Sequence, residues 1–166
     1  FATERFVIDY GKLYNIPTVA VRFFNVYGPR QNPKSPYSGV LSLITECFKN
    51  QQVFTLFGDG EQTRDFIFIQ DVLLALHLIM SNSQAVHEGY NVATGKKSSL
   101  RNIISDYQSV VGRPLQVKAE AARIGDIKQS YADIAKLTQL GFQPRYTLYN
   151  GLTDYWISVK EDSLGE

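Results

Sequence analysis

An almost unbroken apolar run, TVAVRFF at residues 18–24, limits the possible folds of this 166-residue chain more than any other stretch. Its β-branched and aromatic residues favour a strand. A run without polar alternation is typical of a strand that is covered on both faces of a parallel sheet. Parallel strands need crossover connections, which are usually helices, and helical apolar spacing occurs on both sides of this run. The sequence therefore predicts an α/β fold.

Helical spacing, capping residues and chain breakers predict the remaining elements. Helices are expected over residues 1–14 and 38–49, over 72–80 with Asp71 as the cap, over 100–112 with Ser98 or Ser99 as the cap, after Asp133 to near Gly141, and over 148–161. Strands are expected on both sides of the turn GDGE, in GYNVATG and in LQVKA, and a loop over 25–37. No repeat or obvious linker interrupts this pattern.

The composition excludes several classes of protein. Lys and Arg number 17 and Asp and Glu number 16, so the formal net charge is +1. This balance gives no reason to expect nucleic acid or an anionic membrane as a partner. The single cysteine, Cys47, excludes an intrachain disulfide and a cysteine-based zinc site, and its apolar neighbours indicate a buried helical thiol. No apolar run approaches the ~20 residues of a membrane span, and no signal peptide opens the chain, so a cytoplasmic protein is expected.

Two clusters that follow predicted strands could bind a ligand. Asn25 comes directly after the first strand, where ligands sit in open α/β sheets, although NVYGP is equally a turn with Asn at its head. Arg64 offers a fork of donors that suits phosphate oxygens, and Phe57 could present its ring to a base. The alternative is a surface arginine paired with Asp65 or Glu61, and a core phenylalanine.

A third cluster is RIGDIKQSYAD, at residues 123–133, in which Arg123 and Asp126 flank a glycine. The two side chains could hold a phosphate and a sugar hydroxyl together, or form an incidental ion pair in an irregular loop. No G-x-G-x-x-G, Tyr-x-x-x-Lys, Ser/His/Asp set, carboxylate pair or metal-ligand spacing occurs in the chain. The sequence thus offers groups that hold anions and hydroxyls without an obvious reacting group.

Four motifs together resemble one family. RFFNVYGPRQ, GDGEQTRDFIFIQD, YNVATG and RIGDIKQSYAD have the order and spacing of the extended short-chain dehydrogenase/reductase family, which includes nucleotide-sugar 4-epimerases and 4,6-dehydratases. In that family a Tyr-x-x-x-Lys helix lies just before ATER, and the dinucleotide loop lies far upstream. The resemblance implies a C-terminal half, with a residual Rossmann helix and strand at 1–30 and a nucleotide-sugar-binding lobe at 31–166.

The resemblance also implies a role for particular residues. Phe23 and Phe24 match residues beside the nicotinamide end of NAD, and Asn25 matches an asparagine that hydrogen-bonds the substrate diphosphate or sugar. Thr55 and Phe57 match the strand that holds the nucleobase, and Arg64 matches the diphosphate arginine. Arg123 and Asp126 match a clamp on the diphosphate and ribose hydroxyls, Ser130 is a small residue that leaves room for an N-acetyl group, and Asp71 matches a helix-capping aspartate.

The function that the resemblance implies is part of an NAD-dependent UDP-sugar 4-epimerase, which removes and returns hydride at C4 of a UDP-hexose or UDP-N-acetylhexosamine. The intact enzyme is expected to be a homodimer in nucleotide-sugar metabolism. These 166 residues alone are expected to be inactive, because the catalytic Tyr and Lys are expected before Phe1. The alternatives are a nucleotide-sugar 4,6-dehydratase, a non-catalytic nucleotide-sugar-binding module, and a structural α/β fragment.

Overall fold

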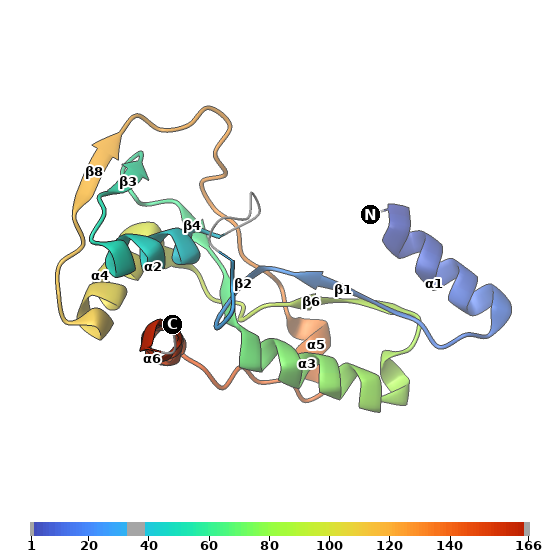
Figure 1. The fold of residues 1–166 in the computed structure, drawn as a ribbon. Helices are drawn as coiled ribbons and strands as arrows, with labels where there is room; N and C mark the ends of the chain where they lie inside the picture. The colour runs from blue at the N-terminus through green and yellow to red at the C-terminus, as the bar shows by residue number, and fades with distance from the viewer. Residues whose placement is uncertain (1, 33–38, 165–166) are drawn as a thin grey trace.

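A computed structural model describes residues 2–32 and 39–164 of the chain. Figure 1 shows a mixed α/β arrangement of short strands and helices. The helices are α1 (Ala2–Tyr14), α2 (Val40–Asn50), α3 (Ile69–Ser81), α4 (Leu100–Val111), α5 (Ala135–Gln139) and α6 (Leu148–Leu164), with a 3₁₀ turn, η1, at Ser83–Ala85. The strands are β1 (Val19–Phe23), β2 (Asn25–Tyr27), β3 (Phe54–Phe57), β4 (Thr63–Arg64), β5 (Phe66–Phe68), β6 (Glu88–Val92), β7 (Ser98–Ser99) and β8 (Val117–Glu120).

The strands associate in pairs that are mostly parallel, which confirms the predicted α/β class. β1 pairs with β6, β2 with β5 and β3 with β8 in parallel, whereas β4 and β7 are antiparallel. The run at 18–24 is therefore a parallel strand, as predicted. It is not covered on both faces along its length, because Arg22 and Phe23 at its end are exposed.

One prediction about strands was wrong, and another left the strand partners open. Residues 25–27 were predicted as loop but form β2, because they find a parallel partner in β5. The strands on either side of GDGE exist, yet they do not pair with each other: β3 takes β8 as its partner and β4 takes β7. Partners this distant in the chain leave no local sequence signal, so the sequence did not identify them.

Local capping signals were more reliable. The Ser99 hydroxyl accepts a hydrogen bond from the Asn102 amide at 3.2 Å and begins α4, and Gly112 ends it in the left-handed conformation, with φ 77°. The Asp133 carboxylate accepts from the Ala135 amide at 2.8 Å at the start of α5. Asp71 was predicted as a cap for its own helix, and this was wrong. Its buried carboxylate accepts instead from the amides of Arg145 and Tyr146, at 2.9 and 3.0 Å, and so attaches the segment before α6.

The core has two parts that lie on different sides of the strands. The first lies between α2, α4 and α6, and the second lies between α3, β6 and α5. Tyr27, in the motif NVYGPR, belongs to the first part: its hydroxyl donates to the Leu148 carbonyl at 3.3 Å. Gly151 in α6 faces this ring so closely that a Cβ there would collide with the phenol oxygen. The tyrosine of the loop motif therefore positions the last helix.

α1 stands apart from the other helices (Figure 1). It lies against β1 and the residues before that strand, with Ile8 and Gly11 buried, while Phe6, Tyr10 and Tyr14 form a row of adjacent rings along an exposed face. Within residues 2–32 and 39–164, none of the helices combines the length and the apolar character needed to cross a bilayer.

Candidate functional site

A cavity of about 430 Å³ opens beside β3 and β4. The side chains that line it come from distant parts of the chain: the strands, the first turns of α2 and α4, and the exposed segment 123–126. Thr55, Phe57, Arg64, Arg123 and Asp126, which the sequence singled out as candidate substrate residues, all line it. The structure therefore brings together two of the three predicted clusters.

Arg123 lies over the ring of Phe57, with its guanidinium carbon 3.9 Å from the ring centroid. This is a cation–π contact, which is favourable because the face of an aromatic ring carries negative potential. The contact joins β3 to the segment 123–126. It also means that one face of the Phe57 ring is occupied by a cation, so a base that stacks on Phe57 must use the remaining surface or displace Arg123.

Arg64 ties the same segment to β4. Its Nη2 donates to Asp126 Oδ1 at 2.8 Å, and its Nη1 donates to the Ile127 carbonyl at 2.5 Å. The alternative, that Arg64 pairs with Asp65 or Glu61, is wrong, since Glu61 pairs with Arg101 instead. Asp126 likewise does not pair with Arg123. The arrangement places two guanidinium groups and one carboxylate around a single cavity.

Asp65 is the residue that sequence reasoning missed. Its carboxylate is fully buried and accepts four hydrogen bonds. Oδ1 accepts from the amide and hydroxyl of Thr94 at 2.9 and 2.6 Å, and Oδ2 accepts from the amides of Gly95 and Ala132 at 2.8 and 3.3 Å. Asp65 thus fixes the loop after β6 and the segment before Asp133 beside the cavity. The only signal in the sequence is a charge placed directly before the fully buried strand β5.

Asn25 and Ser130 lie next to the cavity wall rather than on it. The Asn25 side-chain amide donates to the Asp65 carbonyl at 2.7 Å, and the Ser130 backbone amide donates to the Thr63 carbonyl at 3.1 Å. Both residues are therefore held against the β4–β5 segment that carries Arg64, although neither lines the cavity.

Phe23 and Phe24 lie at the carboxyl end of β1. The Phe24 amide donates to the Val92 carbonyl at 3.2 Å, and Phe23 leaves 50% of its surface exposed. Neither lines the cavity at Arg64.

A second hollow, of about 580 Å³, adjoins the first. Phe57, Arg123 and Asp126 line both, and Lys128 and Gln129 extend the second toward Ser130. The exposed segment 123–126 therefore has space on both sides.

The described residues contain no group of three or more His, Cys, Asp and Glu side chains that could hold a metal ion. Cys47 is partly buried at the edge of the first core, and this burial raises the pKa of its thiol. A raised thiol pKa lowers the thiolate fraction, which agrees with the predicted structural role.

Comparison with known proteins gives consistent matches. The sequence model of the NAD dependent epimerase/dehydratase family matches residues 1–93. A putative UDP-glucose 4-epimerase of Methanocaldococcus jannaschii is 33% identical over 152 residues, which are 92% of this chain and 48% of that protein. The structure of Thermotoga maritima UDP-glucose 4-epimerase with UDP-glucose superposes with a TM-score of 0.89 at 28% identity, over 98% of this chain and 52% of that one.

A structure with both ligands is also similar. UDP-glucuronic acid 4-epimerase of Bacillus cereus, solved with UDP-glucuronic acid and NAD, has a TM-score of 0.83 at 29% identity, over 95% of this chain and 50% of that one. The chain spans about half the length of the relatives that it matches. The family model covers more than half of the chain, and the fold agrees along nearly all of it. The chain therefore belongs to the NAD dependent epimerase/dehydratase family.

Proposed function

We propose that the chain is the substrate-binding part of an NAD-dependent UDP-sugar 4-epimerase and that the cavity at Arg64 holds the nucleotide. The observation that carries this proposal is the meeting of Phe57, Arg64 and Arg123, from separate segments, around one cavity of about 430 Å³. The similar enzymes from Thermotoga maritima and Bacillus cereus, solved with UDP-sugars, support the same class of ligand.

Each lining group has a task that suits its chemistry. Guanidinium forks bind phosphate oxygens with strong charge-assisted hydrogen bonds, so Arg64 and Arg123 would hold the diphosphate. Phe57 and Thr55 would hold the base, and Asp126 would accept from ribose hydroxyls. Because Asp126 already accepts from Arg64, it also orients that guanidinium before a diphosphate arrives. Asn25, beside Asp65, would reach the diphosphate or the sugar.

The end of β1 fits the nicotinamide part of NAD. Phe23 presents a half-exposed ring at the carboxyl end of a parallel strand, which is where ligands bind in open α/β sheets. NAD, when bound, supplies the capacity to accept and return hydride at C4 of the sugar. Phe23 and Phe24 would position the nicotinamide end of the cofactor. Arg64 and Arg123 would hold the nucleotide in place while the sugar rotates.

The finer assignments rest on single residues. Ser130 is small, so we propose that the sugar site accepts a UDP-N-acetylhexosamine as well as a UDP-hexose. The 166 residues contain no Tyr-x-x-x-Lys motif, so by themselves they would bind substrate without turning it over.

Binding is the first test. In the protein as encoded, Arg64→Ala is expected to raise the Kd for UDP at least about tenfold, measured by calorimetry, because a charge-assisted contact with the diphosphate is lost. Arg101→Ala is the matched control, since Arg101 is an exposed arginine that lines neither hollow. An unchanged Kd in Arg64→Ala would remove Arg64 from the site. Failure of the wild type to bind UDP would reject the nucleotide assignment.

Turnover is the second test. The protein as encoded, with NAD and UDP-galactose or UDP-N-acetylglucosamine, is expected to yield the sugar with inverted C4. A 4-keto-6-deoxy product would identify a dehydratase instead, and UDP binding without any product would favour a non-catalytic module.

A further inference from the structure

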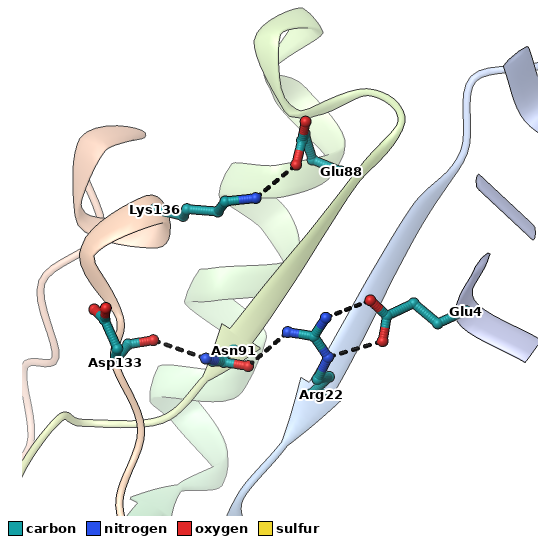
Figure 2. Close-up of polar contacts among 6 residues, drawn as sticks. All are labelled: Glu4, Arg22, Glu88, Asn91, Asp133 and Lys136. Carbon is teal, nitrogen blue, oxygen red and sulfur yellow. Dashed lines mark hydrogen bonds and ion pairs between the residues drawn. The ribbon is translucent and has the colours of Figure 1, made fainter. Parts of the chain in front are cut away.

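Four residues on the face of the β1–β6 pair form a continuous chain of polar contacts, away from the cavity (Figure 2). Glu4 of α1 receives two hydrogen bonds from the Arg22 guanidinium, one of them from Nε at 2.8 Å. Arg22 Nη1 also donates to Asn91 Oδ1 at 3.1 Å, and Asn91 Nδ2 donates to the Asp133 carbonyl at 2.8 Å. We call Glu4, Arg22, Asn91 and Asp133 the polar brace, because they connect α1, β1, β6 and the segment that leads into α5.

The strand register makes the brace possible. Arg22 and Asn91 are partners in the parallel β1–β6 pair, so their side chains lie beside each other. Gly89 lies two residues earlier on β6 and therefore on the same face. A Cβ at Gly89 would stand 2.9 Å from Glu4 Oε1 and 3.3 Å from Arg22 Nη2. A glycine at this position leaves the space in which α1 reaches the sheet through Glu4.

The brace is a structural connection more than a ligand site. It lies in a groove of about 340 Å³, but the Arg22 guanidinium there is paired with the Glu4 carboxylate, as Figure 2 shows. All three nitrogens of the Arg22 guanidinium donate to acceptors within the brace. The neighbouring Lys136 pairs with Glu88 at 2.7 Å. Because each of its nitrogens already donates to a neighbouring side chain, the Arg22 guanidinium connects α1 to the β1–β6 pair.

The far end of the brace belongs to the segment that passes the candidate site. Residues 126–133 begin at Asp126, which Arg64 holds at the cavity, and include Ser130. Asp65 holds the same segment through the Ala132 amide. At Asp133 the brace holds the segment against β6, whose partner β1 ends at Phe23. The segment is thus attached to the nucleotide cavity at one end and to the predicted cofactor strand at the other.

We propose that Arg22 and Asn91 are positioning residues, which fix the distance between the sugar held near Ser130 and the cofactor end of β1. This inference rests on the proposed function. In this proposal the brace determines how the sugar and the cofactor are placed relative to each other. Phe57, Arg64 and Arg123 determine the affinity for the nucleotide.

Asn91→Asp tests the brace with almost no change in shape. The new carboxylate still accepts from Arg22, but it has no donor for the Asp133 carbonyl, so two oxygens face each other and the segment is released. In the protein as encoded, kcat for the UDP-sugar is expected to fall about tenfold because the reacting groups are misplaced. The Kd for UDP is expected to stay within about twofold, since its contacts lie at the cavity. Glu88→Gln, which weakens the neighbouring ion pair in the same groove, is the matched control and is expected to keep the wild-type kcat.

Hydrogen exchange gives a readout that does not depend on turnover. In Asn91→Asp, amides within 126–133 are expected to exchange faster, while those of α4 keep their wild-type protection. Equal hydrogen-exchange protection and equal kcat in Asn91→Asp and Glu88→Gln would contradict the positioning role of the brace. A UDP affinity that falls in parallel with kcat would contradict it as well. A wild type that fails to bind UDP rejects the proposed function instead, and exchange in 126–133 then still decides whether the brace holds this segment.

Discussion

Two pairs of carboxylates show how differently the two ends of this molecule are held together. Asp65 and Asp71 are fully buried and accept mainly from backbone amides of distant segments. Glu4 and Glu88, at the α1 and α5 end, accept from the side chains of Arg22 and Lys136 in solvent-exposed hydrogen bonds. A buried charge is tolerated only when its acceptors are satisfied, whereas a surface ion pair is screened and contributes little. The first pair therefore anchors distant segments, at the site through Asp65 and before α6 through Asp71, whereas the second pair adjusts the placement of elements.

Asp65→Asn should give the largest loss of stability. Each carboxylate oxygen accepts two hydrogen bonds, so an amide nitrogen at either position would face donors and leave them unsatisfied. We expect the free energy of unfolding to fall by about 3 kcal/mol, measured by urea denaturation. Asp59→Asn is the control, because Asp59 is exposed and accepts one amide hydrogen bond. Equal losses in the two variants would contradict the structural role of Asp65.

Asp71→Asn should cost less, because each of its oxygens accepts a single amide. One of these acceptors remains in the variant. We expect a loss of about 2 kcal/mol by the same measurement, with faster hydrogen exchange at Arg145 and Tyr146. If Asp71→Asn lowered the free energy of unfolding as much as Asp65→Asn, the number of donors to the carboxylate would not determine the loss of stability.

Glu88→Gln should have the smallest effect and the clearest dependence on pH. The hydrogen bond from Lys136 holds the pKa of the Glu88 carboxyl below its usual value of 4.5. A lowered pKa stabilises the fold above that usual value, and this contribution is lost as the pH falls through the folded-state pKa. The Tm of Glu88→Gln should lie slightly below that of the wild type at neutral pH, and the difference should disappear once the pH falls below the lowered pKa of Glu88. A difference that grows on acidification would contradict this assignment.

The parts of the fold that could be predicted from sequence are those that depend on near neighbours. The cap at Ser99 and the end of α4 at Gly112 follow from a few adjacent residues, and both are confirmed. The pairing of β3 with β8 depends on residues far apart in the chain, and the sequence did not predict it. Propensity identifies a strand but not its partner.

The same limit applies to the candidate site. Arg64, Phe57 and Arg123 stood out because of their residue types, and the structure places them on one cavity. Asp65 was considered only as a partner for Arg64, because a carboxylate beside an arginine suggests an ion pair. Its real partners, at Thr94, Gly95 and Ala132, come from segments whose approach only the folded chain reveals.

The close approach of Gly151 to Tyr27 makes these two positions interdependent in any sequence that keeps this fold. A methyl group at residue 151 would require either loss of the phenol oxygen at residue 27 or a displacement of the whole C-terminal helix. Substitution at residue 151 is therefore restricted by the aromatic ring at residue 27. Among relatives with this fold, we expect a larger residue at position 151 to occur together with a smaller one at position 27.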